Sequence, residues 1–160
     1  MRNINIRKAS INDAELILHY ITELAIYEKA QHEVLASLED IQRSIFGADS
    51  IAYALICELD NEPVGFAVYF YNYSTWLGKN GLYLEDLYVT PEHRGVGAGK
   101  ALLQHLAKIA VDEDCGRFEW RVLDWNEPSI QFYKSIGALP QDEWIGYRLD
   151  GKALTDFANI

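Results

Sequence analysis

The order of apolar and polar residues predicts a strand and then a helix at the start of the chain. Residues 3–8 alternate between the two kinds, as a strand with one buried face does. Ser10 and Asp13 have the spacing of a capping box, which predicts that a helix begins here. The apolar positions that follow recur at helical spacing: Ala14, Ile17, Leu18, Ile21, Leu24 and Ala25.

The middle of the chain predicts a short helix and three strands. A helix over Leu38–Phe46 is expected to end at Gly47. Two β-rich runs, 51–59 and 64–73, are separated by the hairpin signal Asp60-Asn61-Glu62-Pro63. Asn80-Gly81 predicts a further turn before a strand over 82–90.

The last part of the chain predicts a long helix, a strand, a second helix and a final strand. The long helix has one apolar face, and residues 117–123 have the composition of a strand. A helix over 127–136 is expected to end at Gly137, and 147–149 to belong to a last strand. Antiparallel strands interrupted by helices predict an α+β fold with a mixed sheet. The apolar face of the long helix consists of Leu102, Leu103, Leu106, Ile109 and Ala110.

Composition limits the classes of protein to consider. With 160 residues, 49% of them hydrophobic and 24% charged, the chain is expected to form a single globular domain over residues 1–160. It lacks an apolar run long enough to span a membrane and an N-terminal apolar segment typical of a signal peptide, so a cytoplasmic protein is expected. A net charge of −10 argues against nucleic-acid binding and is compatible with a cationic substrate.

A glycine-rich segment, 94–100, lies between a predicted strand and a predicted helix. Glycine is unfavourable inside a helix, so three glycines close together require a reason. Their backbone N–H groups can surround phosphate oxygens at a helix N-terminus, although a plain flexible loop is the alternative. A Walker A loop is excluded because Arg94 and Ala101 occupy positions that require Gly and Ser or Thr. The dinucleotide fingerprint also fails, at Lys100 or Leu102 according to the starting glycine.

The spacing that does fit is Arg-x-x-Gly-x-Gly at Arg94, Gly97 and Gly99, which resembles the acetyl-CoA pyrophosphate loop of the GNAT N-acetyltransferases. Four more segments, 23–28, 64–67, 82–89 and 125–134, resemble the spermidine/spermine acetyltransferase branch. The resemblance runs from Ile6 to about Leu149. It implies a GNAT fold, a mixed and largely antiparallel sheet that opens between two central strands to admit CoA, and a homodimer.

The same resemblance implies a set of acetyl-CoA contacts. Backbone groups of one strand segment would bind the pantetheine amides, the glycine-rich segment would bind the pyrophosphate, and the start of the next helix would contact the rest of the CoA chain. The residues are Leu87, Tyr88, Val89, Arg94, Gly95, Val96, Gly97, Ala98, Gly99, Lys100, Asn126, Pro128 and Ser129.

Two residues are candidates for proton transfer. A lysine-like amine has a pKa of about 10.4, so a group that accepts its proton is useful at neutral pH. Glu85 and Asp86 are adjacent acids in a predicted strand whose two faces both look covered, and the resemblance gives Glu85 the role of water-mediated proton removal. It gives Tyr133 the role of the acid that protonates the CoA thiolate. For the two acids, the alternatives are a structural ion pair or a surface site at the end of a strand. For Tyr133, the alternative is simple core packing.

The acceptor is less well defined than the donor. The resemblance puts Tyr27, Glu28, Trp76, Glu85, Asp86 and Glu119 on the substrate side. However, Ser74 and Ile145 stand where the polyamine enzymes have acids, which predicts a diamine or lysine-like acceptor and poor use of spermidine and spermine. Acetylation of a protein or peptide amine, and a non-catalytic acyl-CoA-binding regulatory module, are the alternatives.

Histidine and cysteine spacing predicts no metal site. His19, His32, His93 and His105 show no metal-ligand pattern with Cys57 and Cys115, and two cysteines are too few for a disulfide framework. Direct transfer needs no acyl-cysteine intermediate, so Cys115 is not expected to act as a nucleophile.

Overall fold

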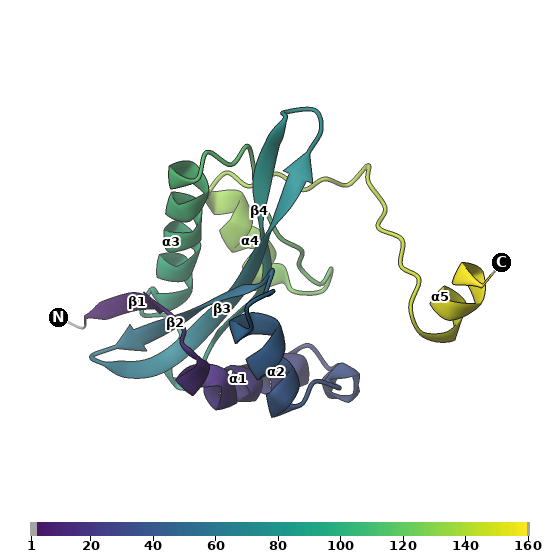
Figure 1. Ribbon diagram of the computed structural model, residues 1–160. Coiled ribbons are helices and arrows are strands. Elements are labelled where there is room, and N and C mark those ends of the chain that lie inside the picture. The colour runs from purple at the N-terminus through teal and green to yellow at the C-terminus, as the bar shows by residue number, and fades with distance from the viewer. Residues whose placement is uncertain (1–2, 160) are drawn as a thin grey trace. The chain divides into compact units, whose positions relative to one another are not determined.

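The computed structural model describes residues 3–159, which form two compact units. The first unit ends at Arg121 and the second begins at Val122. In the first unit, one sheet has the strand order β1-β2-β3-β4-β5 (Figure 1). Neighbouring strands are antiparallel except for β4 and β5, which are parallel. The mixed, largely antiparallel α+β fold is therefore confirmed.

The strands of this sheet are β1 (Ile4–Lys8), β2 (Tyr53–Leu59), β3 (Glu62–Ser74), β4 (Lys79–Val89) and β5 (Phe118–Glu119). The helices of the first unit are α1 (Ala14–Tyr27), α2 (Leu38–Phe46) and α3 (Ala98–Asp112). Short 3-10 turns occupy Ile11–Asp13, Gln31–Glu33 and Pro91–His93. The second unit contains α4 (Glu127–Ser135) and α5 (Gly151–Ala158).

Helices cover both faces of the sheet. On one face, α1 and α2 pack against a buried cluster that includes Tyr20, Ile56, Phe66 and Tyr88. The α3 helix lies on the other face (Figure 1). Its apolar residues Leu102, Leu103 and Leu106 are buried there. Strand alternation explains the division, because successive side chains point to opposite faces. These faces are called the α1 face and the α3 face below.

A partly buried ion network joins β1, β2 and the start of α1. Arg7 Nη1 lies 2.8 Å from Asp13 Oδ2, and Arg7 Nε lies 3.1 Å from Glu58 Oε2. The Arg7 guanidinium lowers the pKa of Asp13. Asp13 also accepts the Ser10 backbone N–H at 2.8 Å, which completes the predicted capping box.

Most predicted elements are present, and the Asp60-Asn61 hairpin is tight because both residues have positive φ, 52° and 72°. The turn predicted at Asn80-Gly81 is wrong, since both residues lie in β4 and the turn comes earlier, at Thr75–Gly78. Gly81 lies close to the Asn72 side chain, whose amide oxygen would have to move to make room for a Cβ.

The region after residue 116 departs most from prediction. The strand expected over 117–123 is reduced to β5, and no strand forms at 147–149. Helix α5 was not predicted; it is an exposed helix in which Lys152 pairs with Asp156 one turn later.

Candidate functional site

A β-bulge at Glu85 is the central irregularity of the sheet. Val68 pairs with Asp86 and Tyr69 pairs with Leu84, so Glu85 is an extra residue in β4 without a direct partner. Strict alternation was predicted through this stretch, and it fails here because the bulge reverses the phase. Asp86 shares the α1 face with Tyr88, as predicted, but Leu84 points to the α3 face. Glu85 itself is exposed, contrary to the prediction that both acids lie under cover.

Two acids are neighbours where β4 passes the end of α1: Asp86 lies in β4, and Glu28 is the residue that follows α1. Burial, together with the charges of Glu85 and Glu28, raises the pKa of Asp86 to about 6. Partial desolvation also raises the pKa of Glu28. No cation forms an ion pair with Asp86 in the described part of the chain. Such a site favours neutralisation, either by a proton or by a bound ammonium group.

A third carboxylate lies on the same face of the sheet. Glu119 pairs with Tyr83 across the β4–β5 ladder, and Tyr83 packs on Phe70 with ring centroids 5.1 Å apart. Phe70 is two positions from Val68, the cross-strand partner of Asp86, so Glu119 and Asp86 share the α1 face. Glu119 also accepts a long hydrogen bond of 3.5 Å from Asn72 Nδ2. Together, Glu28, Asp86 and Glu119 are called the acidic row.

Arg94 folds back toward the sheet and α1. Its Nε donates to the Val89 carbonyl at 2.9 Å, and its guanidinium lies 5.2 Å from the centre of the Tyr27 ring and 5.4 Å from that of Tyr88. These contacts join the predicted substrate residue Tyr27 to the predicted CoA loop. A sequence pattern gives no sign of this contact, because Tyr27 and Arg94 are distant along the chain.

The glycine loop takes a conformation that glycine favours. Gly95 and Gly97 have φ values of +82° and +91°; a Cβ on Gly95 would meet no atom within 4 Å, and one on Gly97 would lie 4.0 Å from Ile4 Cδ1. Gly97 is the N-cap of α3, whose first backbone N–H groups have no partner within the helix. Gly99 differs, because a Cβ there would make ordinary contacts with Leu87 and Val89.

One edge of β4 is open beside this loop. The β5 strand pairs with β4 only at Leu82 and Tyr83, and no other strand of the described residues pairs with that edge from Glu85 to Val89. The backbone groups of the predicted pantetheine segment, Leu87–Val89, therefore belong to a strand that is paired on its β3 side alone.

The second unit holds the remaining predicted residues on α4. Asn126 is at the N-cap, and Pro128 and Ser129 are in the first turn. The Asn126 side chain makes no capping hydrogen bond, and its Oδ1 is buried without a partner among the described residues. Tyr133 lies one turn further and is half-buried, with its ring 6.1 Å from that of Phe132.

Trp76 and Ser74 lie at the β3–β4 turn. The Trp76 side chain is 81% exposed, whereas Ser74 is buried. Ser74 Oγ accepts hydrogen bonds from the Leu77 backbone N–H, at 3.2 Å, and from the Arg117 guanidinium. Arg117 was not identified by sequence reasoning, since no local pattern links it to the turn.

The described residues contain neither a metal-binding group of side chains nor a helix suited to span a membrane. No group of three or more His, Cys, Asp or Glu side chains is arranged to hold a metal ion. None of the helices there combines the length and apolar character that crossing a bilayer requires.

Known proteins share both the fold and the sequence. A model described as the acetyltransferase (GNAT) family matches residues 17–138. A thialysine N-epsilon-acetyltransferase from Sus scrofa is 38% identical over 169 residues, which cover 99% of each chain. Spermidine/spermine N(1)-acetyltransferase-like protein 1 from Homo sapiens is 36% identical over 99% of this chain and 24% of its own length. The solved structure of an integron cassette protein from V. cholerae has a TM-score of 0.82 and 27% identity, covering 98% of both chains.

The sheet with its open β4 edge and the glycine loop before α3 are those of an acyltransferase, and the chain belongs to the acetyltransferase (GNAT) family. Within that family it is similar to the thialysine and spermidine/spermine-like enzymes, so the branch implied by the sequence motifs is confirmed. It is an acetyltransferase that acts on amines.

Proposed function

We propose that this enzyme transfers acetyl from acetyl-CoA directly to a primary amine of a diamine or a lysine-like amino acid. The observation that carries the proposal is the acidic row, Glu28, Asp86 and Glu119, on one face of the sheet beside the Glu85 bulge. The raised pKa values of Asp86 and Glu28 indicate negative charge that lacks a cation within the protein. An ammonium group of the acceptor would supply that cation.

The residues present are suited to acetyl-CoA. The N–H groups at the start of α3 and the two glycines of positive φ suit phosphate oxygens. The buried, unpartnered Asn126 Oδ1 is a hydrogen-bond acceptor available to an amide of the CoA chain. We assign acetyl-CoA binding to the open β4 edge, the glycine loop and the start of α4, namely Leu87, Tyr88, Val89, Arg94, Gly95, Val96, Gly97, Ala98, Gly99, Lys100, Asn126, Pro128 and Ser129.

Two side chains are proposed to transfer protons, one as an acceptor and one as a donor. Acetyl-CoA, when bound, supplies a thioester carbonyl that a neutral amine attacks. Glu85, exposed on the bulge, accepts the proton that the amine must lose, directly or through water. Tyr133 holds a phenolic proton for the departing thiolate, and the two groups have similar ordinary pKa values, about 10 and 8.5. Tyr27, Trp76 and Asp86 would line the acceptor side.

The structure also supports poor use of spermidine and spermine. Ser74 replaces a carboxylate of the polyamine enzymes, and it is buried with its hydroxyl held by Arg117. An Asp at this position would be neutralised by the same guanidinium, so Ser74→Asp is not expected to restore spermine use. The name of the Sus scrofa relative, a thialysine enzyme, agrees with a lysine-like acceptor.

Thiol release with a panel of acceptors tests this proposal. The panel contains thialysine, lysine, putrescine, spermidine and spermine, with Nε-acetyllysine as the matched control whose side-chain amine is blocked. We expect the highest kcat/KM with thialysine, lysine or putrescine, and no release above background with Nε-acetyllysine. A clear preference for spermine would overturn the assignment of the acceptor, and release with none of these amines would favour a protein acceptor or a non-catalytic module.

We further propose that residues 1–160 act as one acetyltransferase domain, as a homodimer in the cytoplasm. Full-length matches to a relative of the same size support a single domain. Sedimentation equilibrium tests the dimer. A mass near twice 18.2 kDa is expected, and a monomer at micromolar concentration would contradict it.

A further inference from the structure

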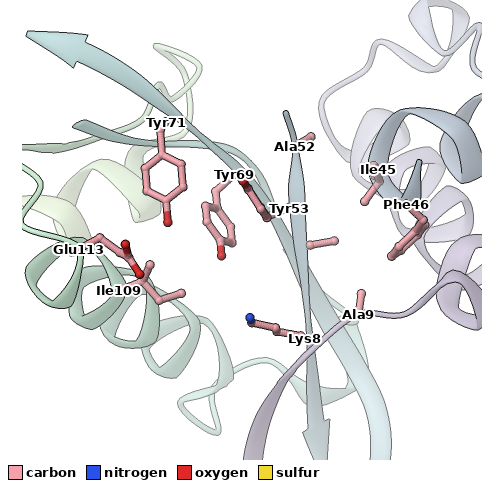
Figure 2. Close-up of a pocket in the computed structure, with 11 residues that line it drawn as sticks. Lys8, Ala9, Ile45, Phe46, Ala52, Tyr53, Tyr69, Tyr71, Ile109 and Glu113 are labelled. Atoms are coloured by element: carbon pink, nitrogen blue, oxygen red, sulfur yellow. The ribbon is translucent and has the colours of Figure 1, made fainter. Parts of the chain in front are cut away.

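A cavity of about 420 Å³ lies at the end of the sheet where β1 ends and β2 begins. Its lining residues fall on either side of β2 (Figure 2). The group on the α3 face consists of Lys8, Tyr53, Tyr69, Tyr71, Ile109 and Glu113. The acidic row is on the α1 face, so this part of the cavity is separate from the candidate acetyl-transfer site.

Three tyrosines form an aromatic wall of the cavity. Tyr53 and Tyr69 are cross-strand partners whose rings stack with centroids 5.4 Å apart. Tyr71 lies edge-on to both, at 5.7 Å from Tyr53 and 6.1 Å from Tyr69. Figure 2 shows the hydroxyls of Tyr69 and Tyr71 pointing toward Ile109 and Glu113. Burial raises the pKa of Tyr69 to about 12, so its hydroxyl stays protonated and can donate at neutral pH.

Two opposite charges face the same space. Lys8 comes from the end of β1 and Glu113 from just beyond the end of α3. Neither side chain takes part in an ion pair within residues 3–159, with the other or with a third group. A purely cationic ligand would gain Glu113 but meet Lys8, and a purely anionic ligand would gain Lys8 but meet Glu113. A ligand that carries both charges satisfies both groups.

We propose that this part of the cavity binds a small zwitterionic amino acid with an aromatic or apolar side chain. Its ammonium group faces Glu113, and its carboxylate faces Lys8. Its side chain packs on the tyrosine rings and Ile109. Aromatic rings stack well on such walls, which favours an aromatic side chain.

Calorimetry without acetyl-CoA tests the proposed site with three probes of one shape. Phenylalanine carries both charges, 3-phenylpropionate only the carboxylate, and phenethylamine only the ammonium group. We expect saturable binding of phenylalanine, about tenfold tighter than either singly charged probe, because each loses one charge-assisted contact. Equal affinities for the three probes, or no saturable binding of phenylalanine, would overturn the proposal.

Five charge-neutralising variants locate the binding. Glu113→Gln should weaken phenylalanine binding about tenfold and leave 3-phenylpropionate binding no weaker, and Lys8→Gln should do the same for phenylalanine while sparing phenethylamine. Asp112→Asn and Lys108→Gln are matched controls, because these residues form an exposed pair with each other. Phenylalanine binding that is unchanged in Glu113→Gln, or abolished by Asp86→Asn in the acidic row, would contradict the assignment. Acetyl transfer in Glu113→Gln should equal that of the unmodified enzyme, so this test is independent of the proposed function.

Discussion

At the residue scale, Asp86 is a half-buried acid whose negative charge is made costly by desolvation and by neighbouring acids. The nearby charges of Glu85 and Glu28 both disfavour its ionisation, and none of the ion pairs among the described residues includes it. An ionised carboxylate in this position lowers the free energy of unfolding. Its presence is understandable if the carboxylate is used to bind a cation.

We therefore predict that Asp86→Asn stabilises the folded protein at neutral pH. Because the pKa rises from 3.8 to about 6 on folding, the folded state binds more protons than the unfolded chain, and stability falls as pH rises from about 4 to about 6. At pH 7 the full cost is present, with an upper value of about 3 kcal/mol. Urea unfolding of the parent and of Asp86→Asn at pH 7 and pH 4 measures the difference in their free energy of unfolding. The added stability of Asp86→Asn should vanish at pH 4, and a variant less stable than the parent at pH 7 would contradict the prediction. Glu62→Gln, at an exposed site that does not contribute to the raised pKa of Asp86, is the control and should change stability little.

Tyr133 makes a second prediction at this scale. Tyr133→Phe keeps the ring beside Phe132 but removes the hydroxyl. If the hydroxyl supplies the proton to the leaving thiolate, kcat should fall by roughly 10²–10⁴ while KM for acetyl-CoA changes little. Tyr147→Phe, at a side chain that is 95% exposed, serves as the control. Full activity of Tyr133→Phe in steady-state thiol release would assign this residue to packing.

At the element scale, the junction of β4, the glycine loop and α3 is the proposed binding site of the acetyl donor. Gly97→Val is predicted to weaken CoA binding at least tenfold, because a branched side chain stands at the phosphate-facing N-cap of α3. The positive φ of +91° adds a strain of about 1–3 kcal/mol, so a control must carry the same strain. Gly78→Val does, since Gly78 also has positive φ, +64°, and open space around it. Calorimetry should show normal CoA affinity in Gly78→Val. Equal affinity in both variants would remove the loop from the phosphate site.

Sequence periodicity predicted the elements that have one buried face. Helix α2 ends at Gly47 as expected, and the buried stripe of α3 includes Leu102 and Leu106. The bulge at Glu85 was missed because the extra residue is defined only by the register with β3, which a single strand does not reveal. The turn was misplaced because Asn80-Gly81 has the composition of a turn, whereas its glycine serves a close approach to Asn72.

The candidate site was predicted less evenly than the fold. The glycine loop could be identified from the sequence because its pattern lies within one short segment, residues 94–99. The contact of Arg94 with Tyr27, and the alignment of Glu119 with Asp86 on one face, depend on pairing between distant segments. The region after residue 116 was predicted poorly, because residues 117–123 and 147–149 have strand composition but require a pairing partner to form strands.

At the scale of the whole molecule, the net charge of −10 creates a field that attracts cationic acceptors. We predict that kcat/KM for a doubly charged diamine such as putrescine falls as ionic strength rises from about 0.05 M to 0.5 M, because the Debye length shortens over this range. Thialysine, whose carboxylate offsets one ammonium group, should show a weaker dependence. Steady-state kinetics with both acceptors in NaCl measures the difference. An equal dependence would mean that the field of the molecule does not guide the acceptor.

The central claim is that the acidic row binds the ammonium group of the acceptor, and the pH dependence of the acceptor KM tests it most directly. In the parent enzyme, KM for thialysine should rise as pH falls through about 6, because protonation of Asp86 removes the charge that holds the ammonium group. In Asp86→Asn, KM should be high and nearly constant between pH 5 and 7, the interval around that pKa. A parent KM that does not change across this interval, or an Asp86→Asn variant with the parent's KM, would contradict the claim.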